Sequence, residues 1–445
     1  MTNTNKEKKY LCSFDKSFSA EVFYNKPDKY RDIERLSNHE GKLISEGSNL
    51  SYAPLSFDKE SLSVNLRNFN RIINFNLKDK EITVEAGMTL AELLNFTLKH
   101  NLWLPQLPGY PLITIGGAVA TNAHGKSCLS HGTIRNAIKS ILIFHSKNGW
   151  LNLSENENKE IFDLTIGGIG LTGSIVNITL KLEELKSKNF TTKKIKVFST
   201  EDCIKNLENL GKKKNSFIYS WNMADNLQEF GKGFIFENII DENNNKKHEI
   251  KIPSFKVNNY FKSKFSIWNN FSIKFANKMF FILNNVQKNE KKEDFLKVIF
   301  PFYGKEFYFD FFGKKGFWES QILISSKNIL SFFDEFKYLF KTYKPDISLF
   351  SFKNMSGEQK FLRFEDNKIC ITFDYINNKK NLLFMDQIDI LCEKYKAIPS
   401  IIKDSRLSKK TIEKCYPEFN KFKDLLNSYD KSRIYRSEIS QRLEI

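Results

Sequence analysis

Three short segments are almost bare of large side chains, so their backbone amides could come close to a bulky anion. Their sequences are "SEGSNLSY" (45–52), "PGYPLITIGGAVATNAHGKSC" (108–128) and "IGGIGLTG" (166–173). Where no Cβ blocks the approach, backbone N–H groups can donate hydrogen bonds directly to phosphate oxygens. Each segment alone is better explained as an ordinary tight turn. The three together predict an extended cofactor that carries phosphate groups.

The longest of these segments ends in two polar side chains, His124 and Lys126. A lysine that is partly desolvated and crowded by a second cation loses proton affinity, so it can act as a general base near neutral pH. Gly168, Gly170 and Gly173 have the GxGxxG spacing, but a strand pattern follows them where a dinucleotide-binding fold requires a helix. The histidines lack metal-ligand spacing, and no P-loop or nucleophile elbow occurs, so we expect no metal site.

The composition is that of a globular protein. Of 445 residues, 41% are hydrophobic and 27% are charged, and no apolar run reaches the roughly 18 residues that a transmembrane helix needs. The N-terminal "MTNTNKEKKY" lacks an apolar region behind it, and the six cysteines are scattered, which favours a cytoplasmic protein with reduced thiols. The net charge of +17 comes from lysine spread through the chain, and we expect no nucleic acid partner. The alternative is a polyanionic partner, such as an anionic membrane face.

Short strand patterns and one helix surround the glycine-rich segments. The runs "KLISEGS", "LSVNL" and "EITVEAG" predict strands, and a capping box of Thr89 and Glu92 predicts a helix that ends near Asn101. A strand over 138–144, a hairpin turn at Asn148-Gly149 and a returning strand follow. The first 185 residues are therefore predicted to be α+β.

The composition changes near residue 186, where lysine runs and many phenylalanines begin, so we place a domain boundary there. The segments 241–249 and 287–295 are expected to be solvated loops because they are rich in Asn, Lys and Glu. The segment 255–283 mixes aromatic residues with Lys and Asn. It is expected to pack inward against a sheet, with contact to a membrane as the alternative.

Two long runs carry a family resemblance. "LPGYPLITIGGAVATNAHGKSCLSHGTIRNAI", followed by "IGGIGLTGSIVNITLKL", resembles the FAD domain of the vanillyl-alcohol-oxidase superfamily (PCMH type). Within it, the chain is most similar to the flavin subunits of polyprenyl-phosphosugar epimerases, the decaprenylphosphoryl-ribose oxidases. The similarity returns in "GFWESQ", "KICITFDY" and the C-terminal "SEISQRLEI".

The resemblance implies a two-domain α+β flavoprotein. The expected parts are an FAD-binding domain of two α+β subdomains (1–185), a substrate-binding domain with an antiparallel sheet (186–397), and a C-terminal segment that returns to the FAD domain (398–445). The implied reaction is oxidation of a secondary sugar hydroxyl, on a polyprenyl-phosphate-linked pentose, as the first half of a 2'-epimerisation. A separate NAD(P)H-dependent short-chain reductase would complete it, and peripheral contact with the inner face of a membrane would bring the substrate.

The resemblance also places the site residues. The expected catalytic residues are Lys403, Lys126 and His124. The expected substrate-binding residues are Tyr52, Trp221, Tyr303, Glu319, Gln321, Lys353, Lys368 and Cys370. The expected cofactor-binding residues are Gly47, Ser48, Asn49, Leu50, Ser51, Tyr52, Pro108, Gly109, Thr114, Ile115, Gly116, Gly117, Ala118, Ala120, Thr121, Asn122, His124, Gly125, Thr133, Asn136, Gly168, Gly170, Gly173, Ile175 and Lys403.

Some positions depart from the family pattern. Leu50, Ala53, Glu319 and Lys368 replace the arginine, glycine, glutamine and asparagine expected there, so the pocket is more charged and the particular sugar is open. Tyr52 stands where relatives that bond flavin covalently use histidine, so FAD is expected to be non-covalent.

The roles of the two lysines stay open at this point. Either Lys403 or Lys126 could be the base, and the other could stabilise negative charge or bind substrate phosphate. Two other functions are the alternatives: a soluble sugar-lactone or alditol oxidase of the same superfamily, and a non-catalytic protein that binds a polyanion or a membrane.

Overall fold

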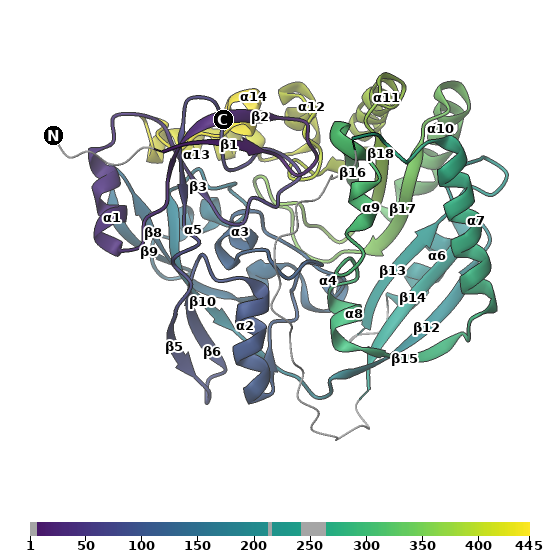
Figure 1. The fold of residues 1–445 in the computed structure, drawn as a ribbon, viewed down its shortest axis with the longest axis horizontal. Coiled ribbons are helices and arrows are strands. Elements are labelled where there is room, and N and C mark those ends of the chain that lie inside the picture. The colour runs from purple at the N-terminus through teal and green to yellow at the C-terminus, as the bar shows by residue number, and fades with distance from the viewer. Residues whose placement is uncertain (1–6, 212–215, 242–263) are drawn as a thin grey trace.

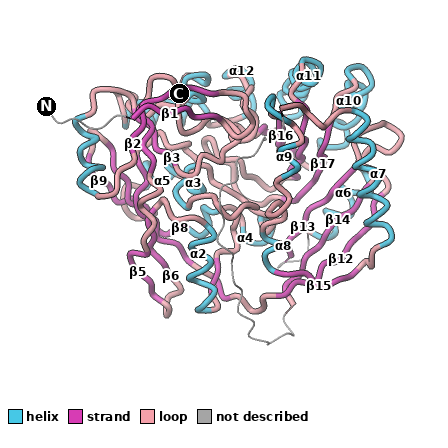
Figure 2. The backbone as a smooth tube through the Cα atoms, in the orientation of Figure 1, coloured by secondary structure: helices cyan, strands magenta, loops and turns pink. Residues whose placement is uncertain are grey.

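The computed structural model describes residues 7–211, 216–241 and 264–445. β-Sheets lie at both sides of the molecule, and loops and turns gather between them (Figures 1 and 2). The architecture is α+β, as the sequence predicts.

The N-terminal region contains two sheets and a short strand pair. The first sheet has the order β1-β2-β4-β3, and the second, antiparallel throughout, has the order β5-β6-β10-β8-β9. The strands are β1 (Glu7–Cys12), β2 (Ser19–Asn25), β3 (Leu43–Glu46), β4 (Leu62–Asn65), β5 (Ile72–Asn76), β6 (Glu81–Glu85), β7 (Leu102–Trp103), β8 (Ile138–His145), β9 (Gly149–Ser154), β10 (Ser174–Lys181) and β11 (Glu183–Glu184). The helices are α1 (Tyr30–Glu34), α2 (Leu90–Thr97), α3 (Ile115–Ala120), α4 (Cys128–His131) and α5 (Lys159–Thr165).

Local sequence signals explain several of these elements. The Thr89 side chain accepts a hydrogen bond from the Glu92 amide and the Glu92 carboxylate accepts one from the Thr89 amide, which confirms the predicted capping box of α2. The left-handed Asn101 ends the 3₁₀ turn that follows α2. The predicted hairpin is also confirmed, because β8 and β9 pair up to His145 and Gly149.

The described residues from 189 onward form two more antiparallel sheets. Their orders are β13-β14-β12-β15 and β17-β18-β16-β19. The strands are β12 (Asn189–Val197), β13 (Ser216–Asn222), β14 (Gly233–Ile240), β15 (Glu290–Asp294), β16 (Phe317–Ile324), β17 (Ile347–Asn354), β18 (Ile369–Ile376) and β19 (Ile398–Pro399). The helices are α6 (Thr200–Leu210), α7 (Asn270–Val286), α8 (Phe295–Ile299), α9 (Phe307–Asp310), α10 (Ser326–Tyr343) and α11 (Lys379–Tyr395).

Helices α10 and α11 cover one face of the β16–β18 sheet (Figure 1). Alternate strand residues face them, so Phe373 stacks on Phe336 at 4.9 Å and on Phe350 at 4.6 Å between ring centroids. The intervening residues on the same strands are therefore turned to the opposite face of the sheet, toward the centre of the molecule.

Two loop predictions have different outcomes. Segment 287–295 is not a loop over its whole length, because Glu290–Asp294 forms the edge strand β15 and pairs with Asn189–Lys193 of β12. Its lysines and carboxylates suit an exposed sheet edge, so composition alone could not exclude a strand. Segment 241–249 lies, from 242 onward, outside the described residues.

The C-terminal segment returns to the first sheet. After α12 (Lys409–Cys415) and α13 (Phe419–Tyr429), the Leu43 amide donates to the Ile434 carbonyl and the Arg436 amide donates to the Leu43 carbonyl. The last helix, α14 (Glu438–Leu443), follows. These hydrogen bonds attach the C-terminal segment to strand β3, which leads into the first glycine-rich segment.

A buried arginine fastens the third glycine-rich segment. The Arg363 guanidinium donates to the Asp163 carboxylate at 2.9 Å and to the backbone carbonyls of Asp163 and Ile166 at 3.0 and 3.1 Å. Its side chain is 5% exposed. Because Ile166 begins "IGGIGLTG", this contact fixes where that segment starts.

Arg363→Ala should therefore destabilise the fold by about 3 kcal/mol, because the buried carbonyls of Asp163 and Ile166 each lose a hydrogen-bond donor, while the Asp163 carboxylate keeps its pair with Lys360 at 2.7 Å. Chemical unfolding monitored by circular dichroism measures the change. Lys421→Ala is the control, because its pair with Glu418 is exposed and should contribute no more than about 1 kcal/mol. Equal stability losses in the two variants would contradict the role given to Arg363.

Candidate active site

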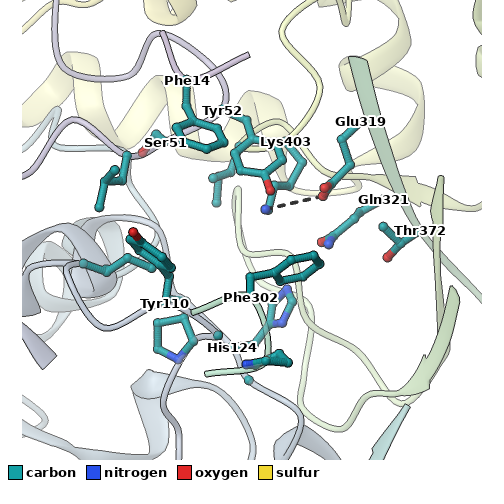
Figure 3. A pocket seen from close by; sticks show the side chains of 18 of the residues that line it. Phe14, Ser51, Tyr52, Tyr110, His124, Phe302, Glu319, Gln321, Thr372 and Lys403 are labelled. Carbon is teal, nitrogen blue, oxygen red and sulfur yellow. Dashed lines mark ion pairs between the residues drawn. The ribbon is translucent and has the colours of Figure 1, made fainter. Parts of the chain in front are cut away.

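A cavity of about 920 Å³ lies between the glycine-rich segments and the polar face of the β16–β18 sheet (Figure 3). A volume of this size suits a cofactor or a small-molecule ligand. The predicted residues that line it are Gly47, Ser48, Asn49, Leu50, Ser51, Tyr52, Pro108, Gly109, Thr114, Gly116, Gly117, Ala120, Thr121, His124, Gly125, Lys126, Gly170, Gly173, Ile175, Trp221, Glu319, Gln321, Lys353 and Lys403. The fold thus brings most of the predicted set to one place.

The glycines of this wall are needed for close approach of backbone segments. A Cβ at Gly47 would overlap the Thr114 hydroxyl, and a Cβ at Gly116 would lie 2.8 Å from that of Ala86. The Thr114 side chain in turn accepts a hydrogen bond from the Gly117 amide at the start of α3. The first two glycine-rich segments therefore touch each other and form one surface that is poor in side chains.

The other predicted residues lie outside the cavity wall, and their contacts with cofactor or substrate stay predictions. These residues are Ile115, Ala118, Asn122, Thr133, Asn136, Gly168, Tyr303, Lys368 and Cys370. Asn122 and Thr133 instead donate to the Glu365 carboxylate at 2.9 and 2.6 Å. Lys368 pairs with Asp366 at 2.8 Å, and Cys370 belongs to a hydrophobic cluster.

Three of the lysines that line the cavity have been predicted as site residues, and they lie in different surroundings. Lys403 Nζ lies 3.4 Å from Glu319 Oε1 and 3.4 Å from the ring centroid of Tyr52 (Figure 3). Lys353 Nζ lies 3.0 Å from His124 Nδ1. Lys126 Nζ lies 3.6 Å from the Tyr219 ring centroid, is shielded from solvent, and has no hydrogen-bond partner among the described residues.

Burial and the neighbouring cations lower the pKa of two groups in the cavity. Desolvation, followed by the charges of Lys305 and Lys353, holds the pKa of Lys126 well below its usual range. Desolvation, followed by the charges of Lys353 and Lys403, also holds the pKa of His124 well below its usual range. The His124 imidazole is therefore neutral, so its Nδ1 can accept a hydrogen bond from the Lys353 ammonium.

A carboxylate pair faces these lysines. Glu319 on β16 and Asp374 on β18 are direct cross-strand partners, and each is buried. Tyr308 donates from its hydroxyl to Asp374 Oδ2 at 2.8 Å. Desolvation, followed by the neighbouring charge of Glu319, raises the pKa of Asp374 well above its usual range. Burial and this neighbouring carboxylate therefore favour the protonated form of Asp374.

The cavity also presents acceptor oxygens toward its interior. Gln321 Oε1 is shielded from solvent and has no hydrogen-bond partner within the described parts of the chain, and the neighbouring Glu319 Oε1 has only Lys403 Nζ, at 3.4 Å, beside it. Both residues line the cavity from the same face of β16. Buried acceptors without donors are costly, so a ligand that brings hydroxyl donors suits this wall.

Sequence reasoning missed Asp374, Tyr308, Thr372 and Ser351, which all line the cavity. One signal was available for two of them. In "KICITFDY", the two-residue period of a strand places Cys370, Thr372 and Asp374 on the same face, and Cys370 was already a candidate. No comparable signal identifies Tyr308, which lies in the short helix α9 among phenylalanines.

Residues 22–154 match the family described as the FAD binding domain. The α+β architecture agrees with that of PCMH-type flavoproteins, and the cofactor of this domain is FAD.

Among curated proteins, the chain is 29% identical over 162 residues to decaprenylphosphoryl-beta-D-ribose oxidase of Mycolicibacterium smegmatis, covering 36% of this chain and 35% of that protein. It is 25% identical over 192 residues to L-gulonolactone oxidase of Bos taurus, covering 42% and 41%. It is 27% identical over 162 residues to the mitochondrial L-galactono-1,4-lactone dehydrogenase of Arabidopsis thaliana, covering 36% and 26%. The chain thus spans less than half the length of each of these relatives.

The observed wall fits FAD. Around Gly47, Gly116, Gly117 and Ala120 the surface carries little or no side chain, as an approaching diphosphate requires. Lys126, which has no hydrogen-bond partner among the described residues, and the Lys403–Glu319 pair line the same cavity, where they could meet the redox-active end of the cofactor.

The raised pKa of Asp374 has a consequence for stability. An acid whose pKa is higher in the folded state than in the unfolded state makes stability fall as pH rises between the two values. Asp374→Asn keeps the shape of the protonated group and removes this loss. The free energy of unfolding of Asp374→Asn relative to the native protein should therefore increase from about pH 4 upward, by about 1.4 kcal/mol per pH unit until the native group ionises, as measured by urea unfolding at several pH values. Asp424→Asn, at an exposed residue of α13, is the control, and parallel curves for Asp374→Asn and the native protein would contradict a raised pKa.

Cys370 should be dispensable for chemistry. It is fully buried, and desolvation raises the pKa of its thiol, so it is not a thiolate nucleophile. We expect Cys370→Ala to keep near-normal turnover in a steady-state assay. A loss of more than about a thousandfold, some 4 kcal/mol, would refute this expectation.

Proposed function

We propose that the protein is an FAD-dependent oxidoreductase that oxidises a secondary hydroxyl of a sugar. The observation that carries this proposal is one cavity in which the predicted FAD-binding segments meet a carboxylate pair, several lysines and the unpaired acceptor oxygen of Gln321. The named relatives include sugar and lactone oxidases and dehydrogenases, which supports a polyhydroxylated substrate.

The cavity residues divide into a proton acceptor and a set of orienting groups. Bound FAD supplies the hydride acceptor for such a reaction. Lys126 is the better base of the two candidate lysines, because desolvation and neighbouring cations hold its pKa well below its usual range, which favours the proton-accepting amine. Lys403 lies 3.4 Å from the Glu319 carboxylate, so this ion pair suits stabilisation of negative charge. His124 would be a neutral neighbour rather than a base.

The acceptor wall would orient the sugar. Glu319 Oε1 and Gln321 Oε1 can each accept a hydrogen bond from a ring hydroxyl, and Thr372, opposite Gln321 on β18, can donate or accept. Such bonds hold one face of the ring in a fixed orientation, so that one C–H bond is presented for hydride removal.

The finer proposal is a polyprenyl-phosphate-linked pentose as substrate. The name of the mycobacterial relative supports it, since that protein is a decaprenylphosphoryl-ribose oxidase. In this proposal the product is passed to a separate NAD(P)H-dependent short-chain reductase, which completes a 2'-epimerisation for cell-envelope biosynthesis. The second candidate is a soluble sugar-lactone or alditol oxidase, which the gulonolactone and galactonolactone relatives favour.

Anaerobic spectroscopy tests these proposals. The purified protein should be yellow, release its flavin on acid denaturation because Tyr52 cannot bond it covalently, and be bleached by a lipid-linked pentose phosphate. Bleaching by free aldonolactones or alditols alone would favour the second candidate. A colourless protein that takes up no FAD would support a non-catalytic role instead.

Substitution of Lys126 tests the choice of base. Lys126→Met should lower kcat by about 10²–10⁴-fold, as expected for loss of a general base, with little change in bound flavin. Lys126→Arg should be equally impaired, because a guanidinium does not accept a proton. The native kcat/KM should rise with pH as the Lys126 ammonium loses its proton, and that acid limb should vanish in Lys126→Met. Full activity of Lys126→Arg would contradict the assignment and favour Lys403 as the general base.

A further inference from the structure

Helix α7 has two apolar faces rather than one. Its inner face packs on the β13–β14 sheet, where Phe281 lies 5.1 Å from Phe234 and Phe280 lies 4.2 Å from Trp221 between ring centroids. Ile273 and Asn277 are buried on the same side. These contacts agree with the inward packing expected for segment 255–283, of which residues 255–263 lie outside the described part of the chain. The other apolar residues of the helix point away from the sheet.

The outer face carries a second apolar stripe that is open to solvent. Phe271, Phe275 and Val286 are 80%, 61% and 74% exposed. An α-helix has 3.6 residues per turn, so the spacing of the stripe residues places them along one side of the helix. They are Phe271, Phe275, Met279, Ile282, Leu283 and Val286. Single exposed apolar residues are ordinary on a protein surface, but a continuous stripe over four turns indicates a binding surface.

The stripe lies beside the opening of the cavity. Ala276, Asn277 and Phe280, on the adjacent side of α7, line the cavity, as does Phe307 of α9, which is 56% exposed. Figure 1 shows α7 along the outer edge of the molecule, with α8 and α9 nearer its centre. A partner on the stripe would therefore lie next to the part of the cavity wall that α7 forms.

The charges around the stripe favour an anionic partner. Helix α7 contains no acidic residue, while Lys274 and Lys278 flank the stripe and are exposed. Lysines also line the cavity from neighbouring elements, together with two carboxylates. These residues are Lys291, Lys297, Lys305, Glu293 and Glu306. Lysines beside an amphipathic aromatic face are typical of helices that lie in the interface of an anionic bilayer.

The contact would lie in the plane of the bilayer. No helix in residues 7–211, 216–241 and 264–445 is long and apolar enough to cross a membrane. An interfacial helix needs only one apolar face for lipid, and its other face stays on the protein. The two faces of α7 match that arrangement.

We propose that the outer stripe of α7 docks on the surface of an anionic lipid bilayer and places the opening of the cavity at that surface. The docking itself does not depend on the proposed reaction. It rests on the proposed function only in one respect, namely that the lipid-linked substrate would then pass from the bilayer into the cavity beside Phe280 and Phe307.

Vesicle sedimentation of the flavin-loaded protein tests the docking. Native protein should bind vesicles that contain phosphatidylglycerol, bind pure phosphatidylcholine vesicles more weakly, and dissociate as salt rises. Replacing Phe271 and Phe275 together by Gln should weaken binding by at least about tenfold, because two large apolar side chains are lost from the interface. Lys274→Gln with Lys278→Gln should weaken binding to the anionic vesicles alone.

The matched control replaces Leu330 and Ile390 by Gln. These residues are 45% and 55% exposed on α10 and α11, away from the stripe, so binding should not change. Circular dichroism should show native melting for both double variants. Equal binding by the stripe variant and the control, or no binding of native protein to anionic vesicles, would overturn the proposal. A native dimer that the stripe variant abolishes would overturn it in favour of a second copy of the chain.

An assay of flavin reduction distinguishes failure of the membrane docking from failure of the proposed reaction. Reduction of the flavin by a short-chain, water-soluble sugar phosphate should be the same in the stripe variant and the native protein. Vesicle binding without reduction by any sugar would leave the docking supported and refute the proposed reaction.

Discussion

The two-residue alternation of β16, β17 and β18 is the constraint on which the site depends. One face of these strands packs in the hydrophobic core under α10 and α11, where Phe373 stacks on Phe336 and Phe350. The opposite face must then carry every other residue into the cavity, and this is where Glu319, Lys353 and Asp374 lie. A register slip of one residue would move the carboxylates into the core and the phenylalanines into the cavity.

Desolvation gives these polar groups their chemistry. In water, Lys126 and Asp374 would both be charged at neutral pH. In the cavity, low solvent access and like charges shift the pKa of each toward its neutral form. Lys403 and Glu319 form an ion pair in the same cavity. An amine with a lowered pKa, an acid with a raised pKa and an ion pair can together accept a proton and stabilise developing charge.

The sequence predicted what local patterns determine. The glycine-rich segments, the capping box of Thr89 and the β8–β9 hairpin each depend on residues close together in the chain, and all were found where expected. The strand β15 was missed because its partner, Asn189–Lys193, lies about a hundred residues earlier. Asp374 and Tyr308 were missed for a related reason, since strand register and a distant short helix bring them together. No local pattern tells which face of a strand will meet a cavity.

The proposed reaction requires FAD and a sugar hydroxyl to meet in this one cavity, which a crystal structure of the protein with flavin and a sugar bound would test. We expect density for the FAD diphosphate against the backbone of Gly47 to Tyr52 and Gly116 to Ala120, with the isoalloxazine ring near Lys126 or Lys403. Flavin density outside the cavity, or a ring separated from both lysines by the protein core, would contradict it.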